Sequence, residues 1–139
     1  MPYRADRMGH GGRAGRGGPM LTAAFALLTL AVVAGTVLGF LHLRETGAAH
    51  PPVAAGLAHG AVGAIGLALL FPIALGPPRG AAEGAAVFGP VSAWLLAAAL
   101  AAGMGVLLRR RHGSGVTMAI HVGIAITGYT VLLAWYLVG

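Results

Sequence analysis

Long apolar runs separated by short polar segments dominate the chain. Four runs of 23 or 24 residues, at positions 20–43, 53–75, 85–108 and 115–138, contain no Asp, Glu, Lys or Arg. Each run is long enough to cross a bilayer core as a helix, which takes roughly 20 residues. The segments between the runs hold nine residues or fewer, so consecutive helices must run antiparallel. Residues 19–139 are therefore predicted to form an all-α, integral membrane four-helix antiparallel bundle.

The N-terminal segment, residues 1–18, has a different composition. It is rich in Gly and Arg and shows no apolar periodicity, which predicts a disordered tail or one that docks on a partner. In a four-helix topology its four arginines share one membrane face with Arg79, and the other four arginines lie at the opposite face. The five arginines on the tail side against four on the other favour a tail in the cytoplasm. We expect the membrane to be a bacterial inner membrane.

Composition restricts the chemistry that the chain supports. Hydrophobic residues make up 58% of it, charged residues 9%, and there is no cysteine, which excludes disulfides, thiolate iron–sulfur clusters and the Cys-x-x-Cys-His attachment of covalent haem. The net charge of +6 comes from arginine without interleaved aromatic residues, so we expect lipid rather than nucleic acid as the partner. The acidic residues Asp6, Glu45 and Glu83 lie outside the apolar runs, and no independent enzymatic catalysis is expected.

Two of the apolar runs carry a histidine well inside their length. His59 comes six residues after the start of the second run, and His121 comes six residues after the start of the fourth. Because both runs enter from the same membrane face, both histidines should lie roughly 9 Å below it. An ionisable residue at membrane depth is costly and marks a functional site by default. The two matched helices therefore predict one shared site.

Small and polar residues accompany both histidines on the same helix face. At offsets of −4, −3, +4 and +7 they are Ala55, Gly56, Gly63 and Gly66 around His59, and Thr117, Met118, Ala125 and Gly128 around His121. The glycines Gly63, Gly66 and Gly128 would let a flat group lie against the backbone. Iron in a porphyrin takes one axial ligand from each side of a flat ring, and facing helices can supply both. Thr117 is placed to orient the nitrogen of His121 that does not bind the metal.

The membrane face nearest the two histidines is basic. It carries Arg44, Arg109, Arg110 and Arg111, and the propionates of a haem would seek such cations. Because the chain has no cysteine, the haem would be the non-covalent b type. The sequence therefore predicts one haem b, with its iron between His59 and His121.

The segments AHGAVGAIGLALL (residues 58–70) and IHVGIAITGYTVLL (residues 120–133) resemble the small four-helix membrane cytochromes b, the group that includes the b561-like proteins. In that group, paired histidines on different spans hold haem within the bilayer. The resemblance implies electron transfer between a quinone or another reductant and an acceptor. The chain has no second pair of histidines at the opposite face, so one haem is expected. We expect an electron-transfer or accessory subunit of a larger respiratory or photosynthetic complex.

Two other functions fit the same residues. In the first, the protein is a cofactor-free structural subunit of a membrane complex, and each histidine hydrogen-bonds across a helix interface. In the second, it handles copper, because Met104 and Met118 lie on the histidine-rich side and thioether with imidazole suits Cu(I).

Overall fold

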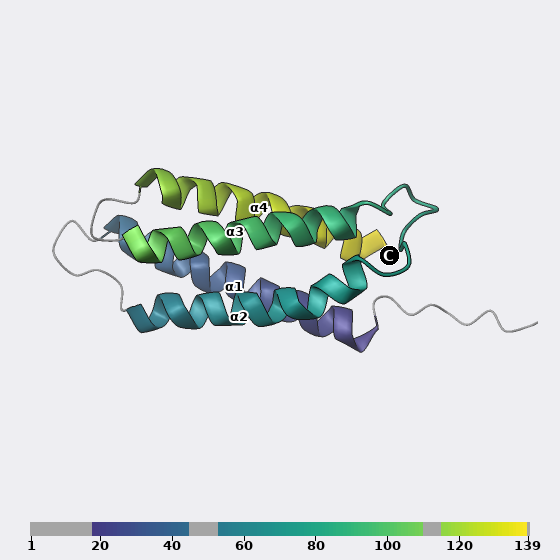
Figure 1. Cartoon of the computed structure of the whole chain (residues 1–139), viewed down its shortest axis with the longest axis horizontal. Helices are drawn as coiled ribbons and strands as arrows, with labels where there is room; N and C mark the ends of the chain where they lie inside the picture. Colours follow the sequence, from purple (N-terminus) through teal and green to yellow (C-terminus); the bar gives the residue numbers. More distant parts are fainter. Residues whose placement is uncertain (1–17, 45–52, 110–114, 139) are drawn as a thin grey trace, which may run out of the picture.

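The computed structural model describes residues 18–44, 53–109 and 115–138 and forms four helices over them (Figure 1). They are α1 (Pro19–Arg44), α2 (Val53–Ala74), α3 (Phe88–Arg109) and α4 (Gly115–Val138). Each contains a stretch of 21 to 24 residues that is long and apolar enough to cross a membrane. The predicted all-α four-helix bundle is confirmed, and the chain is an integral membrane protein.

The start of α3 differs from the prediction. The third apolar run begins at Ala85, whereas the helix begins at Phe88. Pro90 is the third residue of α3, and a helix accepts proline without distortion in its first turn, because the proline nitrogen has no hydrogen to donate. Before α3 the chain turns through Gly80, whose φ is 67°, and the Ala85 amide donates to the Gly80 carbonyl at 2.7 Å. Ala85 therefore belongs to the loop between α2 and α3, where it is buried.

The four helices form two hairpins that face each other. α1 packs closely along α2, and α3 packs closely along α4, while the seams between α2 and α3 and between α1 and α4 are less extensive. The described residues of the diagonal pairs, α1 with α3 and α2 with α4, make no backbone contact. Figure 1 shows α3 and α4 side by side, α1 crossing obliquely behind, and α2 bending toward α3 near its C-terminal end, where Pro72 lies. α2 and α4 thus face each other across the centre of the bundle.

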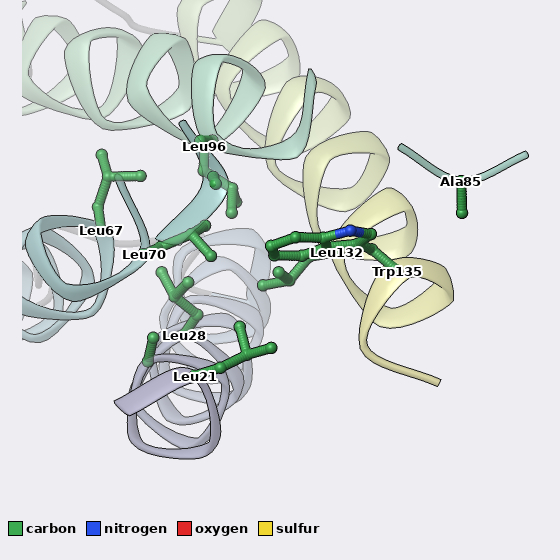
Figure 2. Close-up of a cluster of buried hydrophobic side chains, with 11 residues drawn as sticks. Leu21, Leu28, Leu67, Leu70, Ala85, Leu96, Leu132 and Trp135 are labelled. Atoms are coloured by element: carbon green, nitrogen blue, oxygen red, sulfur yellow. The ribbon is translucent and has the colours of Figure 1, made fainter. Parts of the chain in front are cut away.

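The packed core lies in the half of the bundle next to the α2–α3 loop (Figure 2). Trp135 lies directly over Gly89, since a Cβ added to this glycine would be 2.6 Å from the indole ring. The other half of the bundle, toward the start of α2 and α4, adds no described residue to this cluster. The members of the core are Leu21, Ala24, Leu28, Leu67, Leu70, Ala74, Ala85, Ala93, Leu96, Leu132 and Trp135.

Aromatic rings and hydroxyl groups hold the seam between α1 and α4. Phe25 of α1 stacks on Tyr136 and Tyr129 of α4, with ring centroids 4.2 and 5.9 Å away. Thr29 donates its hydroxyl hydrogen to the Phe25 carbonyl at 2.8 Å. The Tyr129 hydroxyl therefore acts as the donor in its own 2.8 Å contact with the Thr29 oxygen. These contacts join the two hairpins on the side of the packed core.

Large apolar side chains cover the outside of the bundle. Leu30, Ile65, Trp94, Val116 and Ile126 are each more than half exposed. A soluble protein would rarely expose so much contiguous apolar surface. In a bilayer, the lipid chains cover it, so the bundle needs only its interior to be packed by protein.

Candidate functional site

The two histidines meet at the centre of the bundle. Their ring centroids are 6.1 Å apart, and their ring planes are nearly perpendicular, at 87°. α2 and α4 begin at Val53 and Gly115, the residues at which the apolar runs begin. Each histidine is therefore the seventh residue of its helix, and the two rings reach each other from diagonal helices at the same depth.

The imidazole of His121 is oriented by the neighbouring helix of its own hairpin. Its Nδ1 lies 2.7 Å from the backbone carbonyl oxygen of Ala99 in α3. A carbonyl can only accept, so Nδ1 carries the hydrogen and donates it, which leaves Nε2 with a lone pair. The nitrogen that we expected Thr117 to orient is thus held by Ala99 instead. Thr117 packs its Cγ2 close to Gly105 of α3, 3.5 Å from where a Cβ would lie.

The imidazole of His59 has fewer polar contacts. Its Nδ1 atom is buried and makes no hydrogen bond to any described part of the chain. The ring also lies close enough to the backbone of Ala31 in α1 to interact with it. The Ala31 backbone is thus the polar group next to the His59 ring, as the Ala99 carbonyl is next to the His121 ring.

Each imidazole lies against a glycine of the partner helix in its hairpin. A Cβ added to Gly35 of α1 would be 2.8 Å from Cε1 of His59, and one added to Gly103 of α3 would be 3.0 Å from Cε1 of His121. Both glycines provide the space that the rings occupy. Gly35 and Gly39 form a Gly-x-x-x-Gly spacing, which is typical of closely packed membrane helices, but neither Gly35 nor Gly103 was predicted to belong to the site.

The glycines that the sequence placed beside the histidines lie in other surroundings. A Cβ added to Gly66 would be 2.9 Å from Leu28, and one added to Gly128 would be 3.1 Å from Leu96. These two glycines let the helices of each hairpin approach about two turns below the rings. Gly63 makes an ordinary contact, with its Cβ position 3.8 Å from the Cβ of Ala31.

The basic residues named from the sequence lie at the same end of the bundle as the histidines. Arg44 and Arg109 are the last residues of α1 and α3. The exposed Arg44 places its guanidinium 4.5 Å from the centroid of the Phe40 ring. Arg110 and Arg111 lie outside the described residues.

The methionine of α3, Met104, does not lie beside the histidine pair. Met104 is 52% exposed on the outside of the bundle, next in sequence to the glycine that faces His121. Met118 of α4 is half-buried. The outward position of Met104 gives the copper hypothesis no support from this residue.

The spacing of the two rings suits a metal ion bound from both sides. Metal–imidazole bonds are about 2 Å long, and each nitrogen lies roughly 1 Å from its ring centroid, so the centroids of two opposed ligands are about 6 Å apart. The observed separation is 6.1 Å.

Comparisons with protein-family models, curated proteins and solved structures find no match for this chain.

Proposed function

We propose that this membrane protein holds one b-type haem between His59 and His121 and serves as an electron-transfer or accessory subunit of a larger respiratory or photosynthetic complex. The observation that carries the proposal is the meeting of two intramembrane imidazoles from diagonal helices, with ring centroids 6.1 Å apart. Histidine is a common ligand of haem iron, and both imidazoles would be in reach of one such group.

The residues around the pair fit this group in two ways. Ala99 fixes the His121 tautomer that leaves Nε2 as the metal-binding atom, which is the arrangement that histidine ligands usually have. A glycine lies against each ring, and the large core side chains lie in the opposite half of the bundle.

The protein would bind, orient and shield the group. A b-type haem supplies a reversible one-electron couple when bound. His59 and His121 would hold the iron, and the apolar helices would keep water and charged solutes away from it. Arg44 and Arg109, at the end of the bundle nearest the rings, would pair with the propionates. A quinone or a protein partner at that membrane face would then exchange electrons with the site.

A reduced-minus-oxidised absorption spectrum of the purified protein tests the proposal. We expect the α band of a b-type cytochrome in the wild type and its loss or displacement in His59→Ala and His121→Ala. Thr36→Val provides a control, because the Thr36 hydroxyl bonds only within its own helix, to the Val32 carbonyl at 2.9 Å. A folded wild-type protein that contains no haem after expression with excess haem would refute the proposal.

Two observations favour the cofactor-free structural subunit as a second candidate. The hydrogen bond between His121 and Ala99 and the edge-to-face contact of the two rings already join helices without any added group. If this candidate holds, the histidine variants lose stability or fail to join their complex, and no haem spectrum appears in any of the proteins.

A further inference from the structure

The two hairpins are built alike around the histidine pair. In each hairpin, the first helix supplies a glycine and the second helix a histidine whose ring lies on that glycine: Gly35 with His59, and Gly103 with His121. The two closest distances, 2.8 and 3.0 Å from the added Cβ to Cε1, are nearly equal. The contact on one side of the pair is therefore repeated on the other.

The same correspondence holds two helical turns away from the rings. Seven residues after each histidine is a glycine, and seven residues before each facing glycine is a leucine. These four residues pair in the same way: Gly66 packs under Leu28, and Gly128 packs under Leu96. A Cβ on these glycines would lie 2.9 and 3.1 Å from the leucine Cγ atoms. The repeat thus extends through the whole middle of the bundle.

The backbone next to each histidine also corresponds between the two hairpins. A position in α1 corresponds to the position 68 residues later in α3, so Ala31 corresponds to Ala99. Ala99 accepts the hydrogen bond of His121, and the Ala31 backbone interacts with the His59 ring. Both alanines are buried. Each histidine therefore meets the same backbone position of its partner helix.

The sequence carries traces of this correspondence. α1 and α3 share the pattern Leu-Leu-x-x-Ala-x-x-Ala-Gly, at positions 27–35 and 95–103. α2 and α4 share a histidine, a glycine seven residues later and a leucine four residues after that, at positions 59–70 and 121–132. Leu70 and Leu132, which end this pattern, are both fully buried. The connections differ in length, since His59 follows Gly35 by 24 positions and His121 follows Gly103 by 18.

Outside the site the two hairpins have diverged in part. Tyr129 and Tyr136, which stack on Phe25, correspond to Leu67 and Ala74 in the first hairpin. Buried Trp135 corresponds to Ile73. The glycines against the imidazoles and four core leucines, Leu28 with Leu96 and Leu70 with Leu132, have kept their match, whereas the part of the core around Trp135 has not.

We infer that the chain is an internal duplication of one helical hairpin, and that each hairpin supplies an equivalent half of a single site on the two-fold axis between them. Both hairpins enter the membrane in the same direction, so the axis runs along the membrane normal, as in transporters with parallel repeats. The inference rests on the proposed function for the identity of the ligand, a metal macrocycle with two similar faces. The two histidines are then interchangeable axial ligands, and neither side of the iron is left open for an external ligand.

The test compares the two halves in the full-length protein reconstituted in lipid nanodiscs. Carbon monoxide binding and absorption spectra are recorded for the wild type, His59→Ala and His121→Ala. We expect no carbon monoxide binding by the reduced wild type. We expect each single variant to bind carbon monoxide with affinities within about threefold of each other, and added imidazole to restore the wild-type spectrum in both. Retention of haem by one variant with complete loss from the other would overturn the equivalence and leave the haem assignment intact.

A second comparison does not depend on haem. Gly35→Ala and Gly103→Ala add the same methyl group against the two rings, whereas Gly39→Ala and Gly123→Ala add it in open space on α1 and α4. We expect the first two variants to lower the melting temperature by similar amounts and the last two to leave it unchanged or raised. Destabilisation by only one member of the first pair would overturn the equivalence of the halves. If the folded wild type binds no haem, the proposed function fails, and this comparison still decides whether the halves match.

Discussion

The contact between Gly35 and His59 gives the most quantitative prediction. In Gly35→Ala the new Cβ would lie 2.8 Å from Cε1 and 3.3 Å from Nε2 of His59. Favourable carbon–carbon contacts begin at about 3.5 Å, so the ring must retreat by about 0.7 Å. The ring lies against the backbone of α1 and beside His121, so its retreat disturbs both of these contacts.

The expected loss of stability in Gly35→Ala follows from this overlap. Adding a methyl group to a packed site destabilises a protein by about 1–3 kcal/mol. Alanine offsets part of that cost, because it favours the helix by up to about 1 kcal/mol over glycine. Gly39→Ala gains the same helix preference on the same helix, one turn away, and its added Cβ meets nothing within 4 Å. The difference between the two variants therefore isolates the overlap and should be about 1–3 kcal/mol.

The assay is unfolding of the full-length protein by sodium dodecyl sulfate in mixed micelles, followed by circular dichroism. The free energies of unfolding of the two variants are compared with each other and with the wild type. Equal stabilities for Gly35→Ala and Gly39→Ala would show that the His59 ring does not lie on Gly35. The geometry assigned to the first half of the site would then be wrong.

The remaining predictions concern the core, the seam and the orientation of the site. Gly89→Ala should destabilise the bundle by about 1–3 kcal/mol, because its Cβ would lie 2.6 Å from the Trp135 ring; an unchanged unfolding curve would contradict this packing. Leu70→Ala and Leu132→Ala, at two fully buried and corresponding positions, should each cost about 2–5 kcal/mol, and a cost below that range would show that the core lies elsewhere. Tyr129→Phe removes a 2.8 Å hydroxyl contact and should lower the free energy of unfolding by only about 0.6 kcal/mol, as measured by the same dodecyl sulfate titration. Linear dichroism on oriented bilayers should show the haem plane parallel to the membrane normal, since the two rings lie at one depth; a haem lying flat in the membrane would exclude axial binding by this pair.

The sequence was sufficient for the spans and for the depth of the histidines. Charged residues are so rare that the uncharged runs mark the helices almost to the residue, with α2 and α4 beginning where predicted. The start of α3 was misplaced by three residues, because hydrophobicity continues through the loop and only Pro90 limits the helix. Equal spacing from two helix starts on one membrane face was enough to bring His59 and His121 to the same level.

The surroundings of the rings could not be predicted in the same way. All four helices are apolar on every side, so no polar face marks which residues point inward. The partner of His121 is the carbonyl of Ala99, a group that every residue has, and no side chain identifies it in advance. Gly35 and Gly103 matter through contacts between helices. The one available signal was the pattern Leu-Leu-x-x-Ala-x-x-Ala-Gly, repeated in the first and third runs.

The electron paramagnetic resonance spectrum of the oxidised, purified protein is the most direct test that His59 and His121 together hold one haem iron. The two ring planes are 87° apart, and perpendicular axial imidazoles give low-spin ferric iron a strongly anisotropic signal, because the axial ligands set the electronic structure of the iron. We predict this low-spin signal in the wild type and its conversion to a high-spin signal in either single alanine variant. The assignment would be contradicted if the folded, haem-supplemented wild type gave no low-spin signal. It would also be contradicted if both alanine variants kept the low-spin signal.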